Sequence, residues 1–233
     1  MDNAALRGLL TAALEAQLGD RQAAEATARR ILDVALSWSA PSAPMERLDG
    51  VIAYAFGNRL RPGAGAGPDV PLADRLPDPG PVNAALAETV MALHRLKPVR
   101  IYAQWEIARF LRDRHGLNDV VSIEPETGPG GEIVYLSTDG VARAAAAADQ
   151  ARTDPAAALA VVAHRDHARR CVQATRTAGF EAFVASEIPL PAVYDPDSGQ
   201  PWTRRRDIYL LHDMAAQLMG LRAEAIAQAW PQG

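Results

Sequence analysis

The chain has a single cysteine, Cys171, and a single lysine, Lys97. One cysteine excludes an intramolecular disulfide and a cysteine-rich zinc site. Every other basic residue is arginine, and 24 Lys+Arg against 28 Asp+Glu give a net charge of −4. This acidic balance argues against a dedicated duplex-DNA-binding protein, because such proteins present a basic face.

Long apolar runs are also missing. No stretch reaches the roughly 18 uncharged apolar residues that a membrane-spanning helix needs. The first residues show no basic cluster followed by an apolar core and a cleavage site. We therefore expect a cytoplasmic protein with neither a membrane nor a nucleic acid as partner. The 233 residues, 48% of them hydrophobic, are enough for one sizeable α/β core.

Residues 1–39 show the spacing of two helices. Leu6, Leu10 and Leu14 share one helical face, and Asp20 can cap the second helix. We expect residues 1–44 to be an extension that packs on a main domain formed by residues 45–233. The alternative is a hairpin that binds a partner or joins two copies into a homodimer.

After the linker, short apolar runs alternate with helical patterns. This alternation predicts a Rossmann-like three-layer α/β/α sandwich with a mostly parallel sheet, in addition to the N-terminal helical hairpin. A loop rich in glycine and proline over about 59–81 is long enough to be a lid or partly mobile. The predicted strands are 51–56, 99–103, 119–123, 133–136, 158–163 and 181–185, and the predicted helices are 82–96, 105–115, 138–150, 167–178, 207–220 and a last helix ending near Trp230.

Polar residues follow the end of every predicted strand. The carboxyl ends of parallel strands open on one edge of the sheet, where ligands bind and helix N-termini point. We therefore expect a small anionic or nucleotide-like ligand at this edge, although the sequence does not name a reaction. The candidate ligand-binding residues are Gly57, Asn58, Arg59, Gln104, Trp105, Thr138, His164 and Arg170.

Two strand ends carry most of this expectation. Gly57-Asn58-Arg59 is either a tight turn that offers backbone N–H groups and a guanidinium to an anion, or a plain strand-to-loop turn. The residues from His164 to His167, with Arg170 one turn later, would bind phosphate or carboxylate, or would form a capping and salt-bridge cluster. Trp105 could stack on a ring of the ligand.

His167 and Glu106 are the candidate acid–base residues, if the protein is an enzyme. Glu106 is equally well explained as a carboxylate that favours the first turn of a helix. Metal-assisted hydrolysis by His164, Asp166 and His167 ranks last, since no second cluster of metal-ligating residues accompanies them. The sequence therefore predicts no metal site.

The segment Val162-Ala163-His164-Arg165-Asp166-His167-Ala168-Arg169-Arg170 resembles a strand-end motif, T-S-x-Y-H-M-P-R-A, of the YdcF-like family that includes SanA and ElyC. His167 matches the motif histidine and Arg170 its arginine. Residues 49–57 are similar to the opening strand of that family, D-A-I-V-V-L-G-G, whereas Gln104-Trp105-Glu106 stands where the family has S-G-G. The resemblance runs to about Gly220 and implies a Rossmann-like fold. It makes S-adenosylmethionine or a nucleotide a candidate cofactor.

Overall fold

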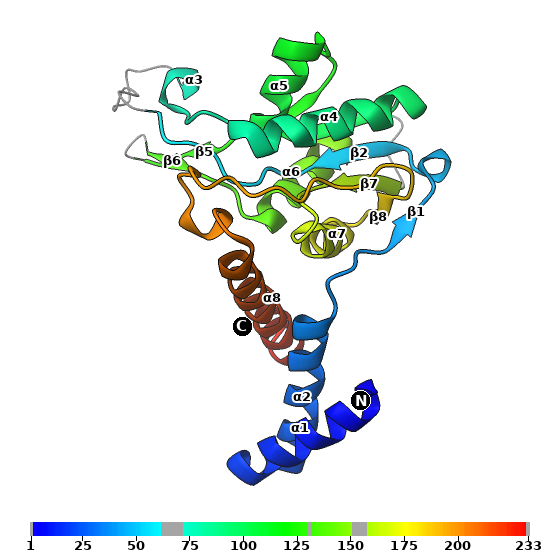
Figure 1. Cartoon of the computed structure of the whole chain (residues 1–233), viewed down its shortest axis with the longest axis vertical. Coiled ribbons are helices and arrows are strands. Elements are labelled where there is room, and N and C mark those ends of the chain that lie inside the picture. Colours follow the sequence, from blue (N-terminus) through cyan, green and yellow to red (C-terminus); the bar gives the residue numbers. More distant parts are fainter. Residues whose placement is uncertain (1, 62–71, 130–131, 151–157, 232–233) are drawn as a thin grey trace. The chain divides into compact units, whose positions relative to one another are not determined.

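A computed structural model describes residues 2–61, 72–129, 132–150 and 158–231 (Figure 1). The chain forms two compact units. Unit 1 combines residues 1–39 with residues 211–233, and unit 2 comprises residues 40–210. The boundary expected after residue 44 therefore lies inside unit 2, because residues 42 and 43 already pair with its sheet.

Unit 2 contains a six-stranded parallel sheet with the strand order β1-β8-β7-β2-β3-β4 among the described residues. All four residues of β2 and all five residues of β7 are buried, which explains their continuous apolar sequences. The strands are β1 (Ser42–Ala43), β2 (Gly50–Ala53), β3 (Arg100–Gln104), β4 (Val121–Ile123), β7 (Ala158–Val162) and β8 (Glu181–Ala185).

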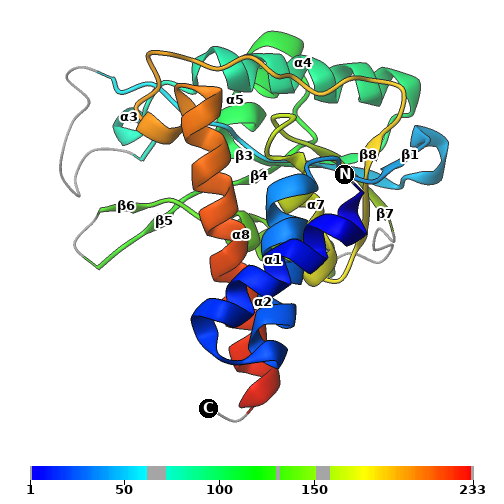
Figure 2. The same ribbon diagram turned by 60° about the horizontal axis from the view of Figure 1, so that its bottom comes forward.

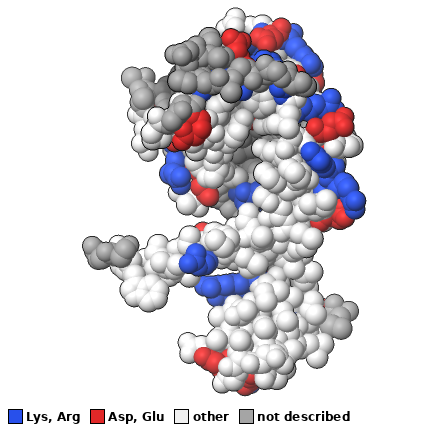
Figure 3. All heavy atoms as spheres, turned by 90° about the vertical axis from the view of Figure 1, so that its left-hand side faces the viewer, with Lys and Arg blue, Asp and Glu red and all other residues white. Residues whose placement is uncertain are grey.

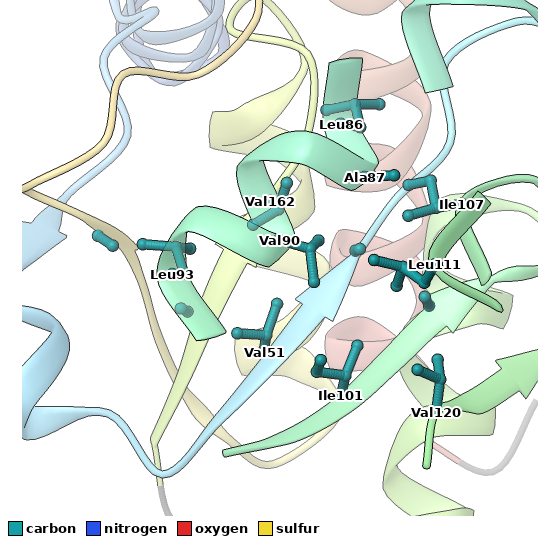
Figure 4. Close-up of a cluster of buried hydrophobic side chains, with 14 of the residues drawn as sticks. Val51, Leu86, Ala87, Val90, Leu93, Ile101, Ile107, Leu111, Val120 and Val162 are labelled. Atoms are coloured by element: carbon teal, nitrogen blue, oxygen red, sulfur yellow. The ribbon is translucent and has the colours of Figure 1, made fainter. Parts of the chain in front are cut away.

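Helices cover both faces of this sheet (Figure 1). On one face lie α4 (Gly80–Leu96) and α5 (Trp105–His115), and on the other lie α6 (Thr138–Gln150) and α7 (Ala168–Thr177). Figure 4 shows Val51 of β2 directed at Val90 of α4, with Ile101 and Leu111 beside them. The next residue of β2, Ile52, packs in the opposite cluster. The predicted three-layer α/β/α arrangement is confirmed.

Strand β2 ends at Ala53, three residues before the end that its apolar run predicts. The reason is a change of hydrogen-bond partner. The Tyr54 N–H still donates to the Val162 carbonyl of β7, whereas the Ala55 and Phe56 N–H groups donate to side chains. The chain therefore leaves the sheet while remaining apolar and buried.

Other elements also differ from the sequence-based expectation. The stretch near residue 133 is strand β6 (Ile133–Val134), which pairs with β5 (Glu126–Thr127) in a separate antiparallel sheet. The two C-terminal helices are one helix, α8 (Arg206–Ala229), because a single glycine costs only about 1 kcal/mol and does not break a long helix. The expected lid at 59–81 lies partly outside the described residues, which resume at the short helix α3 (Leu72–Arg75).

Unit 1 includes the predicted helical hairpin, formed by α1 (Asn3–Leu18) and α2 (Arg21–Leu36) (Figure 2). The Asp20 carboxylate caps α2 by accepting a hydrogen bond from the Ala23 N–H at 2.9 Å. Gly19 ends α1 with a φ of 64°, a conformation that glycine adopts without strain. No helix in the described part of the chain is both long and apolar enough to cross a membrane.

The single lysine and the single cysteine both contribute to the packing of unit 2. Lys97 follows α4, and its ammonium donates hydrogen bonds to the backbone carbonyls of Glu46 and Leu48 at 2.9 and 2.7 Å. These carbonyls lie just before β2. Cys171 is fully buried in α7, as expected for a core residue.

Candidate functional site

The candidate site lies where neighbouring strands β2 and β7 end. From β2 the chain proceeds to β3 on one side, whereas from β7 it proceeds to β8 on the other side. The loops after these two strands therefore diverge, and such a switch point is where open α/β sheets bind ligands. Figure 3 looks toward the carboxyl ends of the strands, and this face of unit 2 is hollowed.

The loop after β2 is fixed by a buried amide. The side chain of Asn83, in the first turn of α4, accepts a hydrogen bond from the Phe56 N–H at 2.9 Å and donates to the Gly57 carbonyl at 2.7 Å. Gly57 has a φ of +71°. A Cβ atom there would lie 2.6 Å from Thr203 Oγ1 and 2.7 Å from Ser198 Oγ. Gly57 therefore serves close packing of another protein segment against its backbone.

That segment, residues 194–206, is called the strap below. Its prolines, Pro196 and Pro201, predict an extended connection, yet the segment folds back over the loop after β2. The Gly199 N–H donates to the Asn58 carbonyl at 2.6 Å. The density of turn-forming residues in Asp195-Pro196-Asp197-Ser198-Gly199 is the one sequence signal for this return.

Arg59, a candidate anion ligand, is directed at the strap. Its guanidinium donates two hydrogen bonds to the Asp195 carboxylate, at 2.8 and 2.9 Å, and lies 3.4 Å from the Asp197 carboxylate. The bond from Arg59 holds the pKa of Asp195 below its usual value. In this structure Arg59 thus anchors the strap.

His164 follows β7 and is fully buried. Its imidazole stacks on the Phe56 ring, and its Nδ1 accepts a hydrogen bond from the Asp166 N–H at 3.3 Å. Burial lowers the pKa of His164 to about 4, against the opposing charge of Asp166. His164 is therefore neutral at pH 7 and supports the loop from beneath.

Asp166 is the centre of an ion-pair cluster. Its carboxylate accepts hydrogen bonds from the Tyr194 hydroxyl at 2.8 Å, from Arg206 at 2.9 Å and from Arg165 at 3.1 Å. Burial raises the pKa of this carboxyl, but these donors outweigh burial and the pKa lies below its usual value. Across the described ranges, no group of three His, Cys, Asp or Glu side chains is placed to hold a metal ion, and the His164-Asp166-His167 alternative thus finds no support.

Arg170 joins two helix N-termini. It lies in the first turn of α7, and its guanidinium donates to Thr138 Oγ1, in the first residue of α6, at 2.8 Å. A longer contact of 3.4 Å reaches the Tyr209 hydroxyl. His167 precedes α7, is 6% exposed, and meets the Tyr209 ring edge-on with 6.0 Å between centroids. Three of the predicted residues are therefore together at one place.

Gln104, at the end of β3, and the next residues contact the loop after β2. The Gln104 side-chain oxygen accepts a hydrogen bond from the Ala55 N–H at 2.7 Å. Glu106 is only 3% exposed, and the Asn58 side chain hydrogen-bonds to its carboxyl group. Trp105 is equally buried, and the Arg109 guanidinium lies 5.2 Å from its ring centroid, so the ring is not open for stacking on both faces.

Burial raises the pKa of Glu106 to about 8. Its Oε2 atom has no hydrogen-bond partner among the described residues, and the same holds for the indole Nε1 of Trp105. Buried polar atoms in native proteins are normally paired. Two such atoms on consecutive residues at a strand end are therefore a feature of the site that requires an explanation.

Comparisons with known proteins give no relative: no family model, no curated protein and no solved structure matches the chain. The resemblance to the YdcF-like family stays a prediction.

Proposed function

We propose that the protein binds a small anionic or nucleotide-like ligand at the carboxyl ends of its parallel strands, beside Arg170. The observation that carries this proposal is the meeting of the N-termini of α6 and α7 at the Arg170–Thr138 contact. Each helix N-terminus carries a partial positive charge, and a guanidinium adds a full charge and a planar set of donors. This combination favours a phosphate or carboxylate group.

Arg170 and Thr138 would hold the anionic group, with Tyr209 orienting the guanidinium. His167 is the acid–base candidate nearest to this position, should a reaction follow binding. The motif that resembles the YdcF-like family places its histidine and arginine at His167 and Arg170. On that ground we propose membership of this family, S-adenosylmethionine or a nucleotide as candidate ligands, and a cytoplasmic location.

The test is calorimetric titration of the full chain with inorganic phosphate, AMP and S-adenosylmethionine. Arg170→Met should weaken binding about tenfold or more, because a charge-assisted contact to an anion is worth roughly 1.5–3 kcal/mol. Arg143→Met is the matched control, since Arg143 is an exposed arginine of the neighbouring helix α6. Absence of binding by all three compounds, or equal affinity in Arg170→Met, would contradict the proposal.

A second candidate function, self-association through unit 1, is favoured by the exposure of α1. None of its 16 residues, all of them described, is buried, and the side chain of Leu9 is 61% exposed. We propose that a second copy of the chain covers this face, because a two-fold contact buries the same apolar residues in both copies.

Sedimentation velocity tests this second candidate. The full chain should sediment as a dimer at micromolar concentration, and the variant Leu9→Glu should be monomeric. Leu96→Glu is the control, since Leu96 is 55% exposed at the end of α4 in unit 2. A monomeric wild type would overturn the candidate.

A further inference from the structure

Glu106 is a buried acid that the proposed anion-binding group, Arg170 with Thr138, does not use. Its carboxyl group is connected to that group through the loop after β2. Asn58 of this loop hydrogen-bonds to Glu106, and Phe56 packs on the Tyr209 ring with 4.6 Å between centroids. The Tyr209 hydroxyl in turn contacts Arg170. Glu106 and Arg170 are therefore linked through two residues of the loop after β2, Asn58 on one side and Phe56 on the other.

Burial favours the neutral form of Glu106, whereas the Asn58 hydrogen bond and the charge of Arg109 oppose it. The Asn58 amide is its uncharged hydrogen-bond partner, and Arg109 on the same helix and Glu124 after β4 supply charges of opposite sign. The charge of Glu106 also contributes to the raised pKa of Tyr135, which follows β6. Burial, aided by the charge of Glu124, outweighs Asn58 and Arg109 and raises the pKa of Glu106 to about 8, so the protonated form predominates at pH 7. A protonated carboxyl group is a hydrogen-bond donor, which a carboxylate is not.

One oxygen of Glu106 lacks a partner, and so does the neighbouring indole N–H of Trp105, within the described chain. An indole N–H can only donate a hydrogen bond. Two donors without acceptors lie at the same strand-end edge of the parallel sheet as the anion-binding group, which indicates that the missing acceptors come with the ligand. They are uncharged, because a charged ligand end would have its counter-charge at Arg170.

We propose that Glu106 donates a hydrogen bond from its protonated carboxyl to an uncharged oxygen or nitrogen of the ligand whose anionic end binds at Arg170. The ligand is then a phosphorylated polyhydroxyl compound, a sugar phosphate or a nucleoside monophosphate, rather than a bare inorganic anion. This inference rests on the proposed function. It adds that the protein also recognises the uncharged part of the same ligand.

If the role of Glu106 were purely structural, its replacement should lower the stability of the fold. A buried acid with an unpaired oxygen is unfavourable for the fold, and an uncharged residue of similar size would suit the position better. If Glu106 instead serves the ligand, Glu106→Leu should preserve or raise the stability while it removes recognition of the uncharged part of the ligand. Such a trade between stability and function is common at binding sites.

The experiment compares inorganic phosphate, ribose 5-phosphate and AMP by calorimetric titration of the full chain at about pH 7 and about pH 9.5, on either side of the pKa of Glu106. The wild type should bind ribose 5-phosphate or AMP about tenfold more tightly than phosphate at the lower pH and lose this preference at the higher pH. Glu106→Gln donates through its amide and cannot ionise, so it should keep the preference at both pH values. Glu106→Leu should lose the preference and still bind phosphate like the wild type.

Thermal unfolding of both variants shows whether they fold, and Glu106→Gln keeps the comparison informative if Glu106→Leu does not. If phosphate binds in an Arg170-dependent manner but the sugar phosphates bind no more tightly, the inference is wrong and the proposed function stands. Equal loss of phosphate and sugar-phosphate binding in Glu106→Leu also overturns the inference, because the role is then structural. If none of the three compounds binds, both the inference and the proposed function are wrong.

Discussion

The imidazole of His164 lies nearly parallel to the phenyl ring of Phe56, with 4.0 Å between ring centroids and 15° between planes. This contact joins the residues that follow the two neighbouring strands β2 and β7. The rings of Tyr194 and Tyr209 close the same cluster, at 5.6 and 4.6 Å from Phe56. The strap and the start of α8 are thereby held to the ends of the sheet by aromatic packing.

Phe56→Ala should destabilise unit 2 by about 3–4 kcal/mol, because it removes a buried ring and leaves a cavity beneath two tyrosines. Phe110→Ala is the control: Phe110 is only half-buried on α5 and has the Arg114 guanidinium over its ring. Urea unfolding should show a clearly smaller loss for this control. Equal losses would show that the aromatic cluster adds nothing beyond ordinary burial.

His164 should make the fold sensitive to acid. Its pKa is about 4 in the folded chain, below the ordinary value of 6.5, so the unfolded chain binds a proton more readily. The stabilising contribution is complete above pH 6.5 and is lost as the pH falls from 6.5 toward 4, by on the order of 3 kcal/mol. His164→Gln should flatten this part of the curve of unfolding free energy against pH. An unchanged slope would assign the acid sensitivity to other groups.

Glu106 should act in the opposite direction. Its folded pKa of about 8 lies above the ordinary value of 4.5, so the folded chain retains the proton that the unfolded chain releases. The free energy of unfolding should therefore decrease as the pH rises from 4.5 to 8, by on the order of 5 kcal/mol. Glu106→Gln should be more stable than the wild type above pH 8 and similar to it near pH 4.5. Denaturant titrations at several pH values measure this difference, and parallel curves for the two proteins would contradict it.

Gly57→Ala should cost more than Gly116→Ala. Both glycines have positive φ values, 71° and 64°, so both substitutions carry the left-handed penalty of about 1–2 kcal/mol. Only at Gly57 would the new methyl group meet Thr203 and Ser198 of the strap at less than 3.0 Å, whereas nothing lies within 4 Å at Gly116. The two losses in the free energy of unfolding are measured by chemical denaturation, and their difference isolates the contact with the strap. Equal losses would mean that the strap moves aside at no cost in free energy.

The layered architecture could be predicted because its signals are local. The helix predicted at residues 105–115 and the strand predicted at 181–185 have those bounds in the structure. The two-residue strand β1 gave no signal, since such a short segment has no periodicity and pairs with β8 only through the tertiary fold. The end of β2 was missed because Ala55 and Phe56 stay apolar after their hydrogen bonds pass to Gln104 and Asn83.

The strand-end positions of the candidate residues could be predicted from the sequence, but the directions of their side chains could not. Strand-end positions follow from the order of elements, and they include Thr138, His167 and Arg170. The direction of Arg59 depends on Asp195, which is 136 residues away and gives no local pattern. Phe56 and Tyr209 were missed as well, because an apolar residue in a strand or helix pattern is indistinguishable from ordinary core.

The ammonium of Lys97 holds the carbonyls of Glu46 and Leu48 at the start of β2, whereas Phe56 lies beyond the end of that strand. Since the sequence has no second lysine, amine acylation has one side-chain target, and the only thiol is buried. A fluorophore coupled there would sit at the opposite end of β2 from the proposed ligand. Such a label would leave the residues of the binding edge chemically untouched.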